Sequence, residues 1–395
     1  MTVSQTLSAP PRSAAPYLAF AGLGTFWGIW GATLPLLRER AGVTDGEFGI
    51  ALLFVGAGAL PAMLATGRLI DALGLRVAGV LLAALGLSGV LVAGAAANFA
   101  ALCAAIFLVG ASSGATDVAI NALAATVERR TGRPVVSRSH GAFSLTVAVV
   151  SLGAGGLGSV TGNLFVNFTA GAVITVVLAR TVYAWAGARP APSPAPHGAG
   201  RTGRGPLAVR TVPLLAVGVI GALAFASENA YQSWGAVLFT DEYLAPPALA
   251  ALAPAAFAAL AALTRFLAAG PAQARPVAAV VLGAVSATAG GVVVMVASSL
   301  WTALLGIAAA AVGTAVIFPT LVSYGLRSVA DRSRGRATSA ITSVAYLGFL
   351  VSPAYFGLLA DASGVRQAFL GVAALTAVLV ALVPVLPALR RRNLL

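Results

Sequence analysis

Apolar residues fall into twelve long runs that are separated by short polar gaps. Each run contains about 20 residues, the length that a helix needs to cross the hydrocarbon core of a bilayer. Lipid cannot hydrogen-bond to an open backbone, so each run is predicted to be helical. The runs are 17–37, 48–66, 77–97, 99–125, 140–160, 164–185, 211–239, 248–267, 276–298, 300–325, 337–359 and 368–389. The pattern predicts an all-α integral membrane protein with twelve transmembrane helices.

Composition supports the same fold class. Of the 395 residues, 59% are hydrophobic and 9% are charged, and the mean hydropathy is +0.95. Soluble domains are roughly 25% charged, and a soluble fold of this size cannot cover so much apolar surface. The single cysteine, Cys103, rules out an intrachain disulfide. These observations exclude soluble globular proteins, nucleic-acid-binding modules and disulfide scaffolds.

Arginines set the expected orientation. The formal net charge is +13, and all 24 basic residues are arginines. With the N-terminus inside, 21 of these 24 are assigned to the cytoplasmic side, in the gaps, at the termini or near the cytoplasmic ends of runs, and only Arg38, Arg40 and Arg366 lie outside. Cytoplasmic loops of membrane proteins carry such an excess of positive charge. We therefore expect a multi-pass protein of the cytoplasmic membrane with both termini in the cytoplasm and no cleavable signal peptide.

The middle of the chain separates two related halves. Residues 186–210 are rich in Pro, Ala, Gly and Arg and are predicted to form a cytoplasmic linker. GRLIDALGLR at 67–76 is mirrored by TRFLAAGPAQAR at 264–275, and TGRPVVSRSHGAFSL at 131–145 by RGRATSAITSVAYLGFL at 334–350. Such a repeat predicts two pseudo-symmetric six-helix bundles. The expected domains are an N-terminal bundle (1–185), the linker (186–210) and a C-terminal bundle (211–395).

The segment between the second and third runs resembles the signature of the major facilitator superfamily. It keeps Gly67, Asp71, Gly74 and Arg76. Other stretches resemble the bacterial fucose-permease-like branch, including its YbjJ-type members: GTFWGIWGATLPLL, ENAYQSWGAVLF and YLGFLVSPAYFGLLAD. The resemblance implies the major facilitator fold and transport by alternating access. It also makes Asp71 part of a cytoplasmic latch, with Arg76 and Arg133 as gating candidates; the alternative is that they only determine topology.

Two acids lie inside apolar runs, where charge is expensive and usually functional. Asp117 has Asn121 on the same helical face, four residues later. We expect Asp117 to carry the coupled proton; the alternative is a protonated acid bonded to a neighbouring helix. Glu228 shares a face with Tyr231 and Gln232, which suits binding of a polar solute; the alternatives are a polar seam of the bundle or an outer gate. Trp27 and Trp30 are spaced to stack on a ligand ring or, equally, to pack against a neighbouring helix. The candidate substrate-binding residues are Glu228, Asn121, Asn229, Tyr231, Gln232, Trp234, Trp27, Trp30 and Tyr346.

No catalytic, cofactor or metal-binding pattern is found, and a chain without lysine has no P-loop. The predicted function is secondary active transport of a small organic solute, sugar-like or otherwise polar or amphiphilic, coupled to protons. A proton-driven efflux antiporter for amphipathic compounds or drugs is the alternative, and a non-transporting scaffold or sensor is a third class. The expected partners are the solute, protons and membrane lipid, with no nucleic acid and a monomeric state.

Overall fold

The computed structural model describes residues 11–187, 211–327, 329 and 331–391. Within these residues, twelve helices are long and apolar enough to span a membrane, as the sequence predicts. The spans are 15–41, 45–73, 77–95, 99–131, 135–161, 164–185, 213–243, 247–268, 276–296, 300–325, 337–363 and 365–388. Most of the predicted linker, 188–210, lies outside the described residues.

The spans are built from fourteen helices in the described chain. Span eight begins in the short α8 and continues in α9, and span twelve joins α13 to α14. The helices are α1 (Ala15–Ala41), α2 (Asp45–Leu73), α3 (Val77–Ala95), α4 (Phe99–Thr131), α5 (Val135–Thr161), α6 (Leu164–Trp185), α7 (Thr211–Tyr243), α8 (Pro247–Ala250), α9 (Leu252–Ala274), α10 (Pro276–Val296), α11 (Leu300–Gly325), α12 (Asp331–Ser363), α13 (Val365–Leu382) and α14 (Val385–Arg391).

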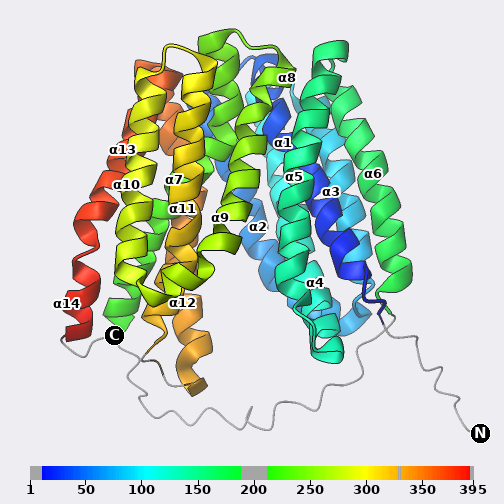
Figure 1. Ribbon diagram of the computed structural model, residues 1–395. Coiled ribbons are helices and arrows are strands. Elements are labelled where there is room, and N and C mark those ends of the chain that lie inside the picture. The colour runs from blue at the N-terminus through cyan, green and yellow to red at the C-terminus, as the bar shows by residue number, and fades with distance from the viewer. Residues whose placement is uncertain (1–10, 188–210, 328, 330, 392–395) are drawn as a thin grey trace, which may run out of the picture.

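Helices α1–α6 pack mainly on one another, and so do α7–α14 (Figure 1). Glycines allow the helices to approach closely, as is usual where membrane helices pack without a hydrophobic driving force between them. A Cβ at Gly58 of α2 would lie 2.0 Å from the carbonyl oxygen of Phe107 in α4. In the second bundle, a Cβ at Gly348 of α12 would lie 1.9 Å from the carbonyl oxygen of Ala222 in α7. Close backbone packing therefore holds each bundle together.

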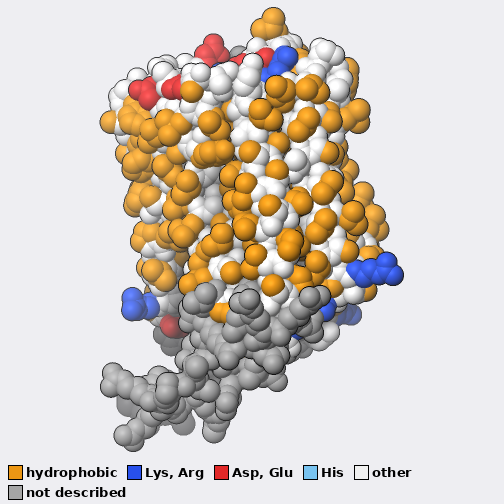
Figure 2. All heavy atoms as spheres, turned by 90° about the vertical axis from the view of Figure 1, so that its left-hand side faces the viewer, with side chains coloured by type: hydrophobic (Ala, Val, Ile, Leu, Met, Phe, Trp, Pro, Cys, Tyr) orange, Lys and Arg blue, Asp and Glu red, His pale blue; other side chains and the backbone are white. Residues whose placement is uncertain are grey.

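The two ends of the molecule differ in charge. Six of the eleven acids lie where α1, α7 and α12 end and α2 begins, and we call this the acidic end: Glu39, Asp45, Glu47, Asp241, Glu242 and Asp361. The opposite end, which we call the basic end, carries most of the arginines, including those around the α2–α3 and α4–α5 connections. Figure 2 shows acidic side chains at one end and hydrophobic side chains covering the middle. This surface fits a bilayer with polar margins.

The bundles join in the half of the molecule next to the acidic end. There α2 packs on α12, α5 on α8 and α9, and α1 on α7. A Cβ at Gly49 of α2 would lie 2.4 Å from the carbonyl oxygen of Pro353 in α12, and one at Gly155 of α5 would lie 2.4 Å from the Ala251 side chain. The bundles diverge toward the basic end (Figure 1). The acidic end is therefore closed in this structure.

Candidate functional site

Asp117 and His140 are connected within the N-terminal bundle. Asn121, one helical turn after Asp117 on α4, donates from Nδ2 to Asp117 Oδ1 at 3.1 Å and to the Asp117 carbonyl oxygen at 2.9 Å. Its Oδ1 lies 3.3 Å from His140 Nε2 on α5. The imidazole is solvent-exposed and packs edge-on against Phe20 of α1, with ring centroids 4.7 Å apart. A carboxyl in the middle of a span is thus linked through one amide to an exposed imidazole.

Glu228 lies in the C-terminal bundle, on α7. This α7 carboxylate is buried, and Gln232, one turn later, donates to its Oε1 at 3.2 Å. Arg265 of α9 donates from Nη2 to the same oxygen at 2.8 Å and from Nε to the carbonyl oxygen of Ala315 in α11 at 3.3 Å. Three helices therefore meet at this ion pair.

The placement of Arg265 corrects the sequence interpretation, which assigned it to a cytoplasmic gap. It lies inside the span 247–268, three residues before its end. An arginine so placed commonly extends outward to water. However, α9 runs from the acidic end toward the basic end, and Cα–Cβ bonds tilt toward a helix N-terminus. The side chain is therefore directed toward the middle of the membrane, where Glu228 lies.

The two groups of polar residues face each other across the bundle interface. Tyr346 of α12 is 45% exposed. His140 of α5 and Arg265 of α9 lie on helices of opposite bundles that pack together. The Tyr346 ring lies against Phe225, with centroids 5.4 Å apart. These residues form what we call the interface site: Asp117, Asn121, His140, Glu228, Gln232, Arg265 and Tyr346.

Other residues predicted to bind substrate are packed away from this site. Trp30 is buried against Phe168 of α6, and Trp27 packs edge-on against Trp30. Tyr231 is fully buried between Phe257 and Phe369 inside the C-terminal bundle.

The last two of these candidates have partners that leave little room for a solute. Trp234 is fully buried, stacked on Phe356 and edge-on to Phe48 of α2. Asn229 is buried and donates to the Phe349 carbonyl oxygen at 2.7 Å. Their contacts favour packing roles.

The gating candidates lie at the basic end. Asp71 is exposed and forms no ion pair with any other residue that the structure describes. The Arg76 guanidinium lies 5.5 Å from the ring centroid of Tyr183 in α6, and Arg133 is exposed. A disengaged Asp71 is the arrangement expected of a latch when the basic end is open, and its role stays a prediction.

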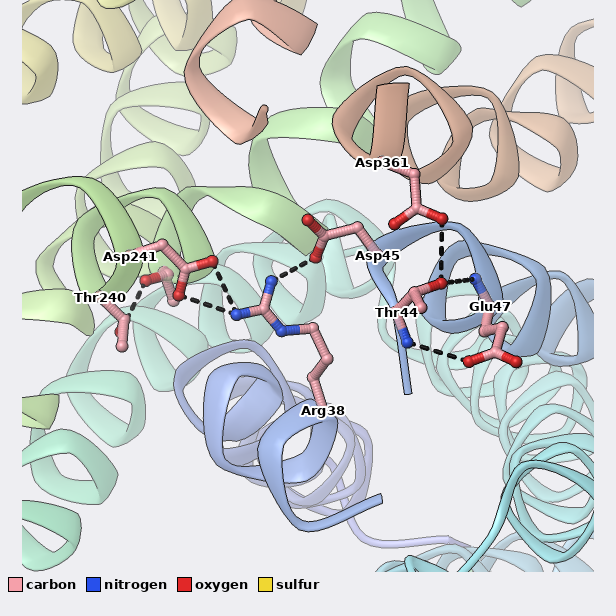
Figure 3. A network of polar contacts seen from close by, with 8 residues as sticks. Arg38, Thr44, Asp45, Glu47, Thr240, Asp241 and Asp361 are labelled. Atoms are coloured by element: carbon pink, nitrogen blue, oxygen red, sulfur yellow. Dashed lines mark hydrogen bonds and ion pairs between the residues drawn. The ribbon is translucent and has the colours of Figure 1, made fainter. Parts of the chain in front are cut away.

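A polar network that sequence reasoning missed closes the acidic end (Figure 3). Arg38, in the last turn of α1, pairs with Asp45 of α2 and donates to both carboxylate oxygens of Asp241 in α7, at 2.7 and 2.8 Å. Thr44, which caps α2 in a capping box, donates to Asp361 of α12 at 2.9 Å. Both Asp241 and Asp361 belong to the opposite bundle, so the network joins the two bundles.

Arg38→Gln should shift the protein toward a state in which the acidic end is open. Hydrogen bonds to charged groups contribute about 1.5–3 kcal/mol, so we expect the open population to rise about tenfold. Spin labels at Thr161→Cys and Leu244→Cys in a Cys103→Ala background should then report a longer distance. The control is Arg366→Gln, because Arg366 pairs with Glu242 within a single bundle. Equal distance changes in both variants would contradict a gating role for Arg38.

Among the described residues, no cluster of His, Cys, Asp and Glu is arranged to hold a metal ion. The interface site consists of hydrogen-bonding and titratable groups from both bundles. Such a site suits binding and release of a polar solute and a proton.

Comparisons with known proteins agree with this architecture. No family model matches the chain. It is 29% identical over 369 residues to an uncharacterized transporter of Sinorhizobium fredii, covering 92% of this chain and 95% of that one. It is also 29% identical over 356 residues to an uncharacterized MFS-type transporter of Yersinia pestis, covering 89% and 90%. The membrane protein MosC of Rhizobium meliloti is 25% identical, covering 89% and 84%.

Solved structures share the fold at low sequence identity. A mutant of the nucleoside transporter NupG superposes with a TM-score of 0.77 at 13% identity, covering 95% of this chain and 99% of that one. A mutant of the peptide transporter POT in complex with sulfate gives a TM-score of 0.72 at 14% identity, covering 99% of each chain. The chain is thus similar in sequence to uncharacterized transporters, one of them described as MFS-type, along nearly its whole length, and it has the fold of these solved transporters.

Proposed function

We propose that the protein is an MFS-type transporter that imports a small polar organic solute across the cytoplasmic membrane, coupled to protons and acting as a monomer. One observation carries the proposal: the two acids inside apolar spans lie in opposite bundles, Asp117 in the span 99–131 and Glu228 in the span 213–243. An acid in the hydrocarbon region is expensive and is typically retained for ion or solute transport. Asp117 is proposed to carry the proton, and Glu228, with Gln232 and Tyr346, to contribute to the solute site.

Alternating access supplies the proposed movement. The bundles 1–185 and 211–395 are proposed to rock around the interface site. If the acidic end faces outward, the structure is an inward-open state, closed outside by the Arg38 network. Asp71 would engage when the cytoplasmic side closes. The sequence resemblance also supports the proposal that the chain belongs to the fucose-permease-like branch. This proposal concerns the branch only and does not extend to the substrate.

Orientation is directly testable. In a Cys103→Ala background, Leu244→Cys at the acidic end should react with a membrane-impermeant maleimide on intact cells, whereas Arg133→Cys should react only after permeabilisation. The physical reason is the excess of arginine at the basic end, which is retained in the cytoplasm. Both positions are exposed, so access does not limit the reaction. Labelling of both from the same side, or the reverse pattern, would contradict the proposed topology.

The transport proposal is tested by screening solutes for thermal stabilisation of the purified protein. Compounds that stabilise it are then measured in proteoliposomes with an imposed pH gradient. Accumulation of a solute above its external concentration, abolished by a protonophore, supports the proposal. Binding without any response to the pH gradient would contradict it.

Proton-driven efflux of amphipathic compounds is the second candidate. The observation in its favour is the aromatic group beside Tyr346, where the Phe225 ring packs against Phe318 and Phe349 with centroids 4.3 and 6.2 Å apart. Aromatic surfaces of this kind accept flat apolar ligands. In that case the pH gradient would drive solute in the direction opposite to proton flow.

A further inference from the structure

We propose that the transported solute carries an organic carboxylate and that the guanidinium of Arg265 binds it. This inference rests on the proposed transport function and narrows its substrate class to organic monoanions. It follows from the placement of Arg265, from its unused hydrogen-bonding capacity and from the charge of the groups that face it.

The Arg265 guanidinium is only partly used by the protein. Its Nε donates to Ala315 and its Nη2 to Glu228, while Nη1 has no hydrogen-bond partner among the described residues. The side chain is 41% exposed, whereas that of its partner Glu228 is 10% exposed. Arginine presents parallel N–H groups that match the two oxygens of a carboxylate. Glu228 therefore anchors the guanidinium on its buried side and leaves donors on the open side.

Groups from the opposite bundle complete the site. His140 lies on α5, the helix of the opposite bundle that packs on α9; it is exposed and has Asn121 at its Nε2. A solute held between Arg265 and His140 contacts both bundles, so its binding responds to their movement. The Tyr346 hydroxyl and the amide of Gln232 are additional hydrogen-bonding groups at the same interface. A hydroxylated carboxylate satisfies this combination better than an apolar compound.

Charge balance explains why a proton would accompany the anion. Asp117, Glu228, His140 and Tyr346 are the titratable groups of the interface site that face Arg265 or one another. Glu228 is already paired with Arg265. Ionised Asp117, linked through Asn121 to His140, repels an incoming anion, and protonation removes that repulsion. One proton and one monoanion move together without net charge, whereas one proton and a neutral solute move one positive charge.

The first experiment measures preference for carboxylates. Thermal shifts of the purified full-length protein are compared for gluconate and sorbitol, glucuronate and glucose, and phenylacetate and phenylacetamide. We expect at least one carboxylate to bind roughly tenfold or more tightly than its neutral partner, the effect of one charge-assisted hydrogen bond. Glu228→Gln should retain this preference, and Arg265→Gln combined with Glu228→Gln should lose it. The double variant avoids an unpaired buried carboxylate that prevents folding.

Arg129→Gln is the control for nonspecific attraction, because Arg129 is exposed at the basic end and bonds only to Thr126 among the described residues. It should keep the full carboxylate preference. The proposal is overturned if neutral partners bind equally well, if none of the three carboxylates stabilises the protein, or if the double variant keeps the preference.

The second experiment measures charge movement with the carboxylate that binds. Uptake into proteoliposomes driven by a pH gradient should be unchanged by an imposed inside-negative potassium diffusion potential. Acceleration by that potential would contradict uptake of a monoanion with one proton. If neutral solutes are accumulated under a pH gradient, the transport proposal stands and the carboxylate proposal fails. If no solute of either kind responds to the gradient, the transport proposal itself fails.

Discussion

Replacing Asp117 with asparagine should reduce solute accumulation in proteoliposomes to equilibration, with an inside-to-outside ratio of about 1, whatever the pH gradient. Asparagine has nearly the same size and keeps hydrogen-bonding groups for Asn121, so the helix packing is preserved. It cannot exchange a proton. Counterflow, in which labelled solute exchanges for unlabelled solute without net proton movement, should continue. The measurement is the accumulation ratio beside the counterflow rate for the same preparation.

Glu128→Gln is the matched control for Asp117→Asn. Glu128 lies on the same helix, but at the basic end, where it accepts a hydrogen bond from the Val136 backbone at 2.9 Å. Its replacement should leave proton-driven accumulation intact. Uphill accumulation by Asp117→Asn under a proton gradient would remove Asp117 from the coupling mechanism.

Glu228→Gln should weaken solute binding roughly tenfold while a pH gradient still drives accumulation. The substitution removes the carboxylate that holds the Arg265 guanidinium in position, so solute binding must also order that side chain. Ordering one such side chain costs about 0.5–1.5 kcal/mol, which corresponds to a weakening of up to about tenfold. The measurement is the Kd from ligand-dependent thermal stabilisation, with the accumulation ratio at saturating solute as the second readout.

Glu242→Gln is the control for Glu228→Gln, since Glu242 is an acid on the same helix that pairs with Arg366 at the acidic end. It should leave the Kd unchanged.

A comparison of melting temperatures separates loss of stability from loss of solute binding. Arg265→Gln should lower Tm more than the double variant Arg265→Gln, Glu228→Gln does, because the single change leaves Glu228 buried without a partner. An unchanged Kd in Glu228→Gln would exclude Glu228 from the solute site.

The spans were predictable because lipid imposes one requirement on all of them. A run of apolar residues has no alternative to a helix in the membrane, so length and hydropathy suffice. The span 164–185 has the predicted boundaries, and 276–296 differs by two residues at one end. Side-chain contacts within one helix were equally predictable, because residues four apart share a helical face. Asn121 contacts Asp117, and Gln232 contacts Glu228.

Contacts between helices were not predictable from periodicity. Arg265 was counted as a gap residue because charge near the end of an apolar run is usually a topology signal, and only the position of Glu228 on another helix reveals its role. Arg38 was missed for the same reason, since Asp241 is 203 residues away. A usable sequence signal for such an ion pair does exist. It is an arginine within three residues of the end of one span, combined with an acid inside another span.

For the aromatic candidates, the sequence did not separate ligand contact from packing. Trp30 was considered because a cavity aromatic can stack on a ligand ring, and Tyr231 and Trp234 because they accompany polar residues; all three are buried among the packed helices. A helix surrounded on all sides gives no periodicity that separates a cavity face from a packing face. Helix α1 illustrates this, because most of its span is buried.

The most direct test of proton-coupled transport is the pH of a weakly buffered medium around proteoliposomes when solute is added with no gradient imposed. We expect inward solute flow to draw protons with it, so that the external medium becomes more alkaline. Asp117→Asn should abolish this change while counterflow persists. Acidification would instead indicate antiport. Solute uptake with no change of external pH in the unsubstituted protein would contradict the account.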